Sequence, residues 1–134
     1  MEFIEPYNIT VLVMGLAGLT FFMQLVVLDV VGITTKHTPG HPVEADHNTF
    51  LFRASRGLSN TNESVAIFIL FAVFSVLSSA DPTWLNTSAL VYLAGRIAHM
   101  MFYYSNLKIL RSISFAVSLV GLLAMFISGL MSWL

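Results

Sequence analysis

Long apolar segments alternate with short polar ones along this chain of 134 residues. Uncharged runs cover residues 6–28, 64–80 and 112–134, and residues 82–106 are apolar apart from Arg96 and His99. Since a helix needs roughly 20 apolar residues to cross a bilayer, the pattern predicts four membrane-spanning helices, at residues 7–33, 49–79, 82–106 and 110–133. We therefore expect one domain over residues 1–134, an all-α integral membrane protein folded as a four-helix bundle.

The connections between these segments carry local signals. Residues 33–49 form a polar stretch that we expect to be a solvated loop of about fifteen residues, which is long for a helical hairpin. Asp81 and Pro82 are suited to be the N-cap and the first residue of the third helix. Gly15, Gly18, Gly121 and Gly129 are expected to permit close helix packing.

The basic residues give a predicted orientation. Lys36 and Arg53 flank the first loop, and Lys108 and Arg111 flank the third. The turn at Asp81 and both termini have no Lys or Arg, so the positive-inside rule predicts that the first and third loops face the cytoplasm. Both termini would then lie outside it, and we expect the bacterial inner membrane.

The first helix carries acids where a signal peptide would carry bases. Glu2 and Glu5 precede its apolar run, so we expect this helix to be retained as a membrane span.

Composition agrees with a membrane protein and excludes some chemistry. The chain is 57% hydrophobic and 10% charged, with a mean hydropathy of +0.82, outside the usual range of soluble domains. It contains no cysteine, which excludes disulfides, thiolate metal sites and a nucleophilic thiol of the protein itself. The net charge of −1 gives no indication of nucleic-acid binding, and we expect none.

Polar residues follow one face at the start of the second helix. Arg53, Arg56, Asn60 and Glu63 are spaced by three, four and three residues, which confines them to an arc of about 80°. An arginine near a helix end often reaches the lipid head groups, and this alternative applies to Arg53.

A second polar face lies in the third helix. Tyr92, Arg96, His99 and Tyr103 are spaced by four, three and four residues and fall within an arc of about 60°. An ionisable side chain this deep in a membrane usually faces a cavity or a partner. A purely structural ion pair between Arg96 and Glu63 is an alternative explanation.

The polar face of the second helix suggests a ligand. It extends about 10 Å from Arg56 to Glu63, close to the length of an extended tripeptide. Arginine is suited to carboxylates, glutamate to an ammonium group and asparagine to amides. Glutathione offers all these groups together with a thiol, which the chain itself lacks.

The paired motifs resemble one known family. Arg56, Asn60 and Glu63 in the second helix, with Arg96, His99 and Tyr103 in the third, are similar to motifs of the MAPEG family, the membrane-associated proteins in eicosanoid and glutathione metabolism. This family includes microsomal glutathione transferases, and the resemblance covers residues 50–121.

The resemblance implies a homotrimer that binds glutathione between subunits, and it assigns roles to named residues. The implied glutathione-binding residues are Arg53, Arg56, Asn60, Glu63, Arg96, His99 and Tyr103. Arg111 matches the family arginine that faces the thiol, so Arg111 and Tyr103 are the implied catalytic residues. A basic anchor at the lipid head groups beside Lys108 is the alternative role for Arg111. The sequence departs from the family in having Ser64 where some members have tyrosine, and Lys36 alone at the end of the first helix.

Three functions are consistent with these residues. The first is a glutathione transferase or peroxidase that attacks lipophilic electrophiles or hydroperoxides at the subunit interface. The second is a non-catalytic relative that binds a lipid in the same crevice. The third is a small channel or proton-coupled carrier that uses Glu63, His99 and Arg96.

The first loop offers a separate candidate site. Two histidines there could meet over a metal at the turn formed by Pro39 and Gly40, although a solvated loop without metal is the expectation. The residues concerned are His37, His41, Glu44, Asp46 and His47.

Overall fold

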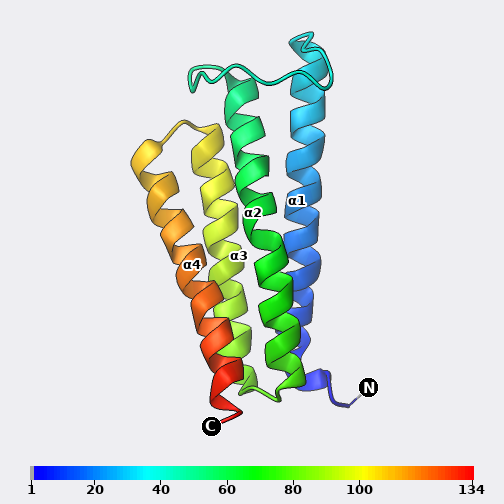
Figure 1. Ribbon diagram of the computed structural model, residues 1–134, viewed down its shortest axis with the longest axis vertical. Coiled ribbons are helices and arrows are strands. Elements are labelled where there is room, and N and C mark those ends of the chain that lie inside the picture. The colour runs from blue at the N-terminus through cyan, green and yellow to red at the C-terminus, as the bar shows by residue number, and fades with distance from the viewer. Residues whose placement is uncertain (1) are drawn as a thin grey trace.

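The computed structural model describes residues 2–134 and forms an up-and-down bundle of helices (Figure 1). A 3-10 turn, η1 (Glu5–Tyr7), leads into α1 (Asn8–Thr34), which is followed by α2 (Phe50–Leu77), α3 (Pro82–Tyr104) and α4 (Lys108–Met131). The predicted all-helical architecture is confirmed, and each helix begins and ends within two residues of its expected boundary.

Three of the four helices are apolar enough to span a membrane. They are Glu5–Thr34, which includes η1, Phe50–Leu77 and Lys108–Met131. The sequence pattern predicted the third helix as a further span, but α3 is not apolar enough to be counted with these three. Helix α3 has 23 residues, which is about 34 Å of helix and long enough to cross a bilayer core. Its two ionisable residues in the middle of the span, Arg96 and His99, are buried inside the bundle and need not contact lipid.

Side chains define where α2 and α3 begin. Oδ1 of Asp81 accepts a hydrogen bond from the Trp84 amide at 2.9 Å, and Pro82 is the first helical residue, as the sequence predicts. Thr49 caps α2 in the same way, with its hydroxyl 3.4 Å from the Phe52 amide nitrogen. These caps satisfy amides that would lack partners at a helix start.

Glycine lets α4 lie against both α3 and α2. A Cβ atom on Gly121 would lie 2.6 Å from the Tyr92 nitrogen of α3, and one on Gly129 would lie 2.6 Å from a ring carbon of Phe74 on α2. The close packing predicted for these two glycines is confirmed. The same expectation for Gly15 and Gly18 is wrong within the chain, because nothing lies within 4 Å of the Cβ position at either residue.

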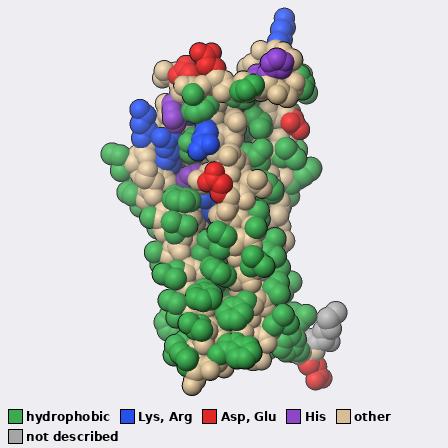
Figure 2. All heavy atoms as spheres, viewed as in Figure 1, with side chains coloured by type: hydrophobic (Ala, Val, Ile, Leu, Met, Phe, Trp, Pro, Cys, Tyr) green, Lys and Arg blue, Asp and Glu red, His purple; other side chains and the backbone are tan. Residues whose placement is uncertain are grey.

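The two ends of the bundle differ in charge (Figure 2). We call the end that holds the α1–α2 and α3–α4 connections the basic end, since it contains Lys36, Arg53, Arg56, Lys108 and Arg111. We call the opposite end, where the chain begins and ends, the acidic end. It contains Glu2, Glu5 and Asp81 and has no Lys or Arg among the described residues.

The acidic end is held together by hydrogen bonds from the start of the chain. The hydroxyl of Tyr7 donates to the Ala80 carbonyl at 2.8 Å, and the side chain of Asn86 bonds both to Pro6 and to Thr10. These bonds fix the start of α1 beside the start of α3.

Candidate functional site

Arg96 joins the two polar faces that the sequence predicts. Its side chain is 3% exposed, and its guanidinium donates to Asn60 Oδ1 and to Thr61 Oγ1, each at 2.8 Å. The sequence left open a purely structural ion pair between Arg96 and Glu63. This alternative is wrong, because the acceptors of Arg96 among the described residues are neutral side chains. A buried guanidinium held by neutral oxygens keeps its positive charge uncompensated.

An aromatic and cationic cluster lies between Arg96 and the end of α3. The ring of His99 lies 5.3 Å from that of Tyr103 and 5.8 Å from that of Phe115 on α4. The guanidinium of Arg111, also on α4, lies over the Tyr103 ring at 4.5 Å from its centroid, within the range of a cation–π interaction. The structure thus brings together the two residues, Tyr103 and Arg111, that the sequence resemblance marks as catalytic.

Several nitrogen atoms of this cluster have no hydrogen-bond partner in the described chain. They are Nε of Arg96, Nδ1 of His99 and one terminal nitrogen of Arg111, all of them buried. Buried donors without acceptors are rare in folded proteins and destabilise them. An anionic ligand entering beside these residues would provide acceptors for both arginines.

His47 extends the cluster from the first loop. Its ring is nearly parallel to that of Tyr103, with 6.3 Å between centroids and 21° between planes. Partial desolvation, reinforced by the charges of Arg111, Lys108 and Arg56, lowers the pKa of His47, and the Asp46 carboxylate only partly offsets this. The cations around His47 favour the binding of an anion beside this cluster.

Arg53 has a role within the chain. Its guanidinium donates to the carbonyls of His47 at 2.7 Å, Asn48 at 3.0 Å and Tyr104 at 3.3 Å. These bonds attach the first loop and the end of α3 to α2. The expectation that Arg53 binds a ligand stays a prediction, and the arginine does not simply extend to the lipid head groups.

Arg56 and Glu63 form the outer part of the polar face on α2. Both side chains are exposed, whereas Asn60 between them is half-buried through its contact with Arg96. The described chain therefore covers one side of this face and leaves the other side open. A ligand that contacts Arg56 and Glu63 would therefore bind on the outside of the bundle, over Asn60 and Arg96. A second subunit can pack on this side.

Sequence reasoning missed three members of the cluster. Thr61 gave no signal, since it lies one position away from the polar face that contains Asn60. Phe115 was one apolar residue among many in α4. His47 was noticed only as a loop histidine, because nothing in the sequence places the loop above Tyr103.

The histidines of the first loop do not gather around a common point. His37 Nε2 lies 3.0 Å from the carbonyl oxygen of His41, while His47 packs against Phe52 and Tyr103. In residues 2–134, no three His, Asp or Glu side chains are arranged to hold a metal ion.

Comparison with known proteins gives one result. A family model described as "MAPEG family" matches residues 9–131, which includes α1 as well as the polar faces of α2 and α3. No curated protein and no solved structure matches the chain.

Proposed function

Because the chain belongs to the MAPEG family, we propose that it is a glutathione-dependent membrane enzyme of the transferase or peroxidase type. The observation that supports this most strongly is the stacking of Arg111 on Tyr103 beside buried, unsatisfied nitrogen donors. Family membership itself supports the coarser statement that this is a membrane protein of glutathione or eicosanoid metabolism type.

The proposed glutathione site uses both polar faces. Arg56 would bind a carboxylate, Glu63 the ammonium group and Asn60 the peptide amides, since these pairings match charge and hydrogen-bond type. Arg96 and His99 would complete the site from α3. The exposed positions of Arg56 and Glu63 favour a site shared with a neighbouring subunit, and the homotrimer is the assembly that the family resemblance implies.

The proposed chemistry requires a thiolate. A free thiol has a pKa of about 8.5, so only a few per cent is ionised near neutral pH. Arg111 would stabilise the negative sulfur, and the Tyr103 hydroxyl would donate a second hydrogen bond to it. The thiolate would then attack an electrophilic carbon and displace a leaving group. With a lipid hydroperoxide it would attack the terminal oxygen and break the O–O bond, which gives the alcohol and a sulfenic acid of glutathione that a second glutathione converts to the disulfide and water. The lipophilic substrate would reach this site from the bilayer.

The test is glutathione binding by the purified protein and two variants. Arg56→Ala and Glu63→Gln should each weaken glutathione binding roughly ten- to a hundredfold. Each variant loses a charge-assisted contact worth about 1.5 to 3 kcal/mol. Lys108→Ala and Glu44→Gln make matched charge changes at exposed positions outside the proposed site and should bind as the parent does. Equal affinity in the parent and both site variants would refute the proposal. Glutathione binding without a thiolate absorption band or turnover would instead favour a lipid-binding role.

A further inference from the structure

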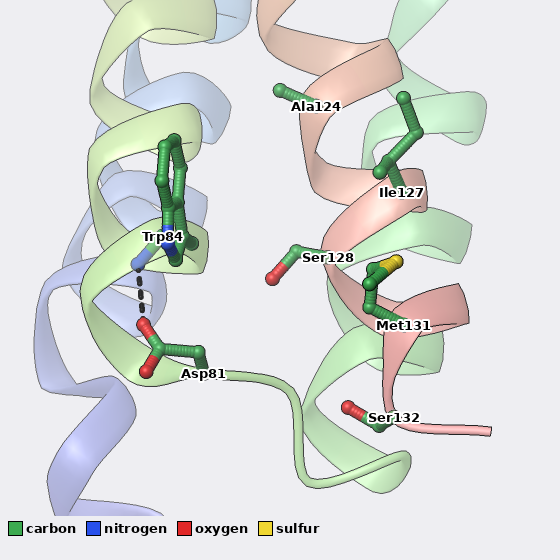
Figure 3. A pocket seen from close by; sticks show the side chains of 7 residues that line it. All are labelled: Asp81, Trp84, Ala124, Ile127, Ser128, Met131 and Ser132. Atoms are coloured by element: carbon green, nitrogen blue, oxygen red, sulfur yellow. Dashed lines mark hydrogen bonds between the residues drawn. The ribbon is translucent and has the colours of Figure 1, made fainter. Parts of the chain in front are cut away.

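A cavity of about 580 Å³ lies at the acidic end, between the start of α3 and the end of α4 (Figure 3). It is separate from the proposed glutathione site, which is at the basic end. Its lining residues are Asp81, Trp84, Ala124, Ile127, Ser128, Met131 and Ser132.

Helix packing explains why the space is there. Gly121 brings α4 against α3, where a Cβ would lie 3.0 Å from the Ser88 carbonyl. Beyond this point α4 is attached to α2, since the Ser75 hydroxyl donates to the Met125 carbonyl at 2.8 Å and Gly129 lies against Phe74. The last two turns of α4 therefore follow α2 and leave a gap beside α3.

Ser128 supplies a buried polar group to this cavity. Its side chain is 9% exposed, and its hydroxyl has no hydrogen-bond partner in the described chain. The hydroxyl points into the space between α3 and α4 (Figure 3). Nearby serines on helices, such as Ser88, donate to a carbonyl of their own helix at 2.7 Å. A buried hydroxyl without a partner is unfavourable, so a ligand with a polar group would be stabilised here.

Asp81 supplies charge at the rim. One of its oxygens caps α3 by accepting from the Trp84 amide, which leaves the second oxygen free of that bond. All six Lys and Arg residues of the chain lie elsewhere, so Asp81, Glu2 and Glu5 make this end uniformly acidic. The electrostatic complement of this end is a cation.

The rest of the wall is apolar. Ala124, Ile127 and Met131 share a stripe of α4 with Ser128, and Trp84 faces them from α3 (Figure 3). Trp84 and Met131 are largely exposed, so the cavity opens towards the surface of the bundle. Such a wall accommodates a hydrocarbon chain that enters from the bilayer.

We propose that this cavity binds an amphiphile with a primary ammonium head group and an apolar chain. The ammonium group has three N–H donors, which match the carboxylate of Asp81 and the hydroxyls of Ser128 and Ser132. The chain of the amphiphile packs against Trp84, Ile127 and Met131. Both an aminophospholipid and a single-chain amine present this chemistry.

Fluorescence of Trp84 reports binding directly. The chain has two tryptophans, so Trp133→Phe leaves Trp84, in the cavity wall, as the single fluorophore. In this background, phosphatidylethanolamine with brominated chains should quench at a concentration roughly two- to fivefold lower than brominated phosphatidylglycerol. An exposed charge pair gives a preference of only this size. The preference should decrease as salt is added.

Matched variants separate the cavity from the general charge of this end. Asp81→Asn keeps the N-cap, since asparagine caps as well as aspartate, and should remove the preference. Ala124→Leu should remove it by filling the cavity. Two control variants should keep the preference for phosphatidylethanolamine. Glu5→Gln removes a charge at the same end of the bundle, and Ala94→Leu adds the same bulk at an exposed position of α3.

A competition experiment with dodecylamine distinguishes the two sources of the head group. If dodecylamine relieves quenching only in proteins that retain Asp81, and phosphatidylethanolamine shows no preference, the ligand is a single-chain amine. If phosphatidylethanolamine shows the preference, the ligand is an aminophospholipid. Equal quenching by the two phospholipids with no effect of dodecylamine overturns the proposal. The absence of quenching by any lipid also overturns the proposal, since it would show that another subunit covers the cavity.

Discussion

The buried guanidinium of Arg96 on α3 donates to the side-chain oxygen of Asn60 on α2 at 2.8 Å. A second donor of the same guanidinium bonds Thr61 at the same distance. Two helices that are separate in sequence are thereby joined through one charged group in the middle of the bundle. The contact fixes the register of the two helices and holds the guanidinium near the ring of Phe115, 6.0 Å from its centroid.

Thr61→Val should lower the stability of the bundle. The change keeps side-chain volume but leaves a buried donor of Arg96 without its acceptor, which costs about 1–3 kcal/mol. The melting temperature in detergent should fall by a few degrees. Thr87→Val is the matched control, since the Thr87 hydroxyl is exposed and bonds only to its own helix at the Thr83 carbonyl. Equal melting temperatures for the two variants would show that Arg96 does not depend on Thr61.

Gly121→Ala should be more disruptive than its size suggests. The added methyl group would lie 2.6 Å from the backbone nitrogen of Tyr92, and a backbone atom cannot move aside as a side chain can. Overpacking of this kind costs typically about 1–3 kcal/mol. Gly15→Ala has open space around its Cβ position and should be neutral or slightly stabilising, since alanine favours helices. Thermal unfolding of the two variants side by side measures the difference. Similar melting points would mean that α3 and α4 are less tightly packed than the structure indicates.

Arg111→Ala tests activation of the thiol apart from binding. If Arg111 stabilises the sulfur anion over Tyr103, the variant should bind glutathione within a few fold of the parent. It should lose the ultraviolet absorption of the bound thiolate and most turnover with an aryl halide or a lipid hydroperoxide. Lys108→Ala removes an exposed charge one helical turn away and should keep both signals. An unchanged thiolate band in Arg111→Ala would assign the activating role to another residue.

The orientation of the bundle in the membrane is testable with a fusion. The basic end carries nearly all the Lys and Arg residues, so the positive-inside rule directs it to the cytoplasm and both termini to the opposite side. A reporter that is active only in the cytoplasm, fused after Leu134, should be silent, while the same reporter inserted in the first loop after Gly40 should be active. A bright signal from the C-terminal fusion would reverse the orientation and place the proposed glutathione site outside the cytoplasm.

Periodicity in the sequence determined the helices and the faces that carry polar residues. Apolar runs of about 20 residues define spans because of the thickness of a bilayer. The spacings from Arg56 to Glu63 and from Tyr92 to Tyr103 define faces because every residue of a helix turns by the same angle. Asp81 and Pro82 predicted the start of the third helix, because N-cap and first-turn preferences depend only on the local backbone. These features depend on neighbours in the sequence, so the sequence suffices for them.

Contacts between helices were decided by tertiary structure, because helical spacing does not define how far one helix slides or rotates against another. This is why Thr61 and not Glu63 accepts from Arg96, and why Arg53 bonds loop carbonyls. It is also why His47 reaches Tyr103 across a fifteen-residue loop. The cavity beside Ser128 has the same origin, since it exists only because α4 leaves α3 to pack on α2. No periodicity within a single helix encodes that divergence.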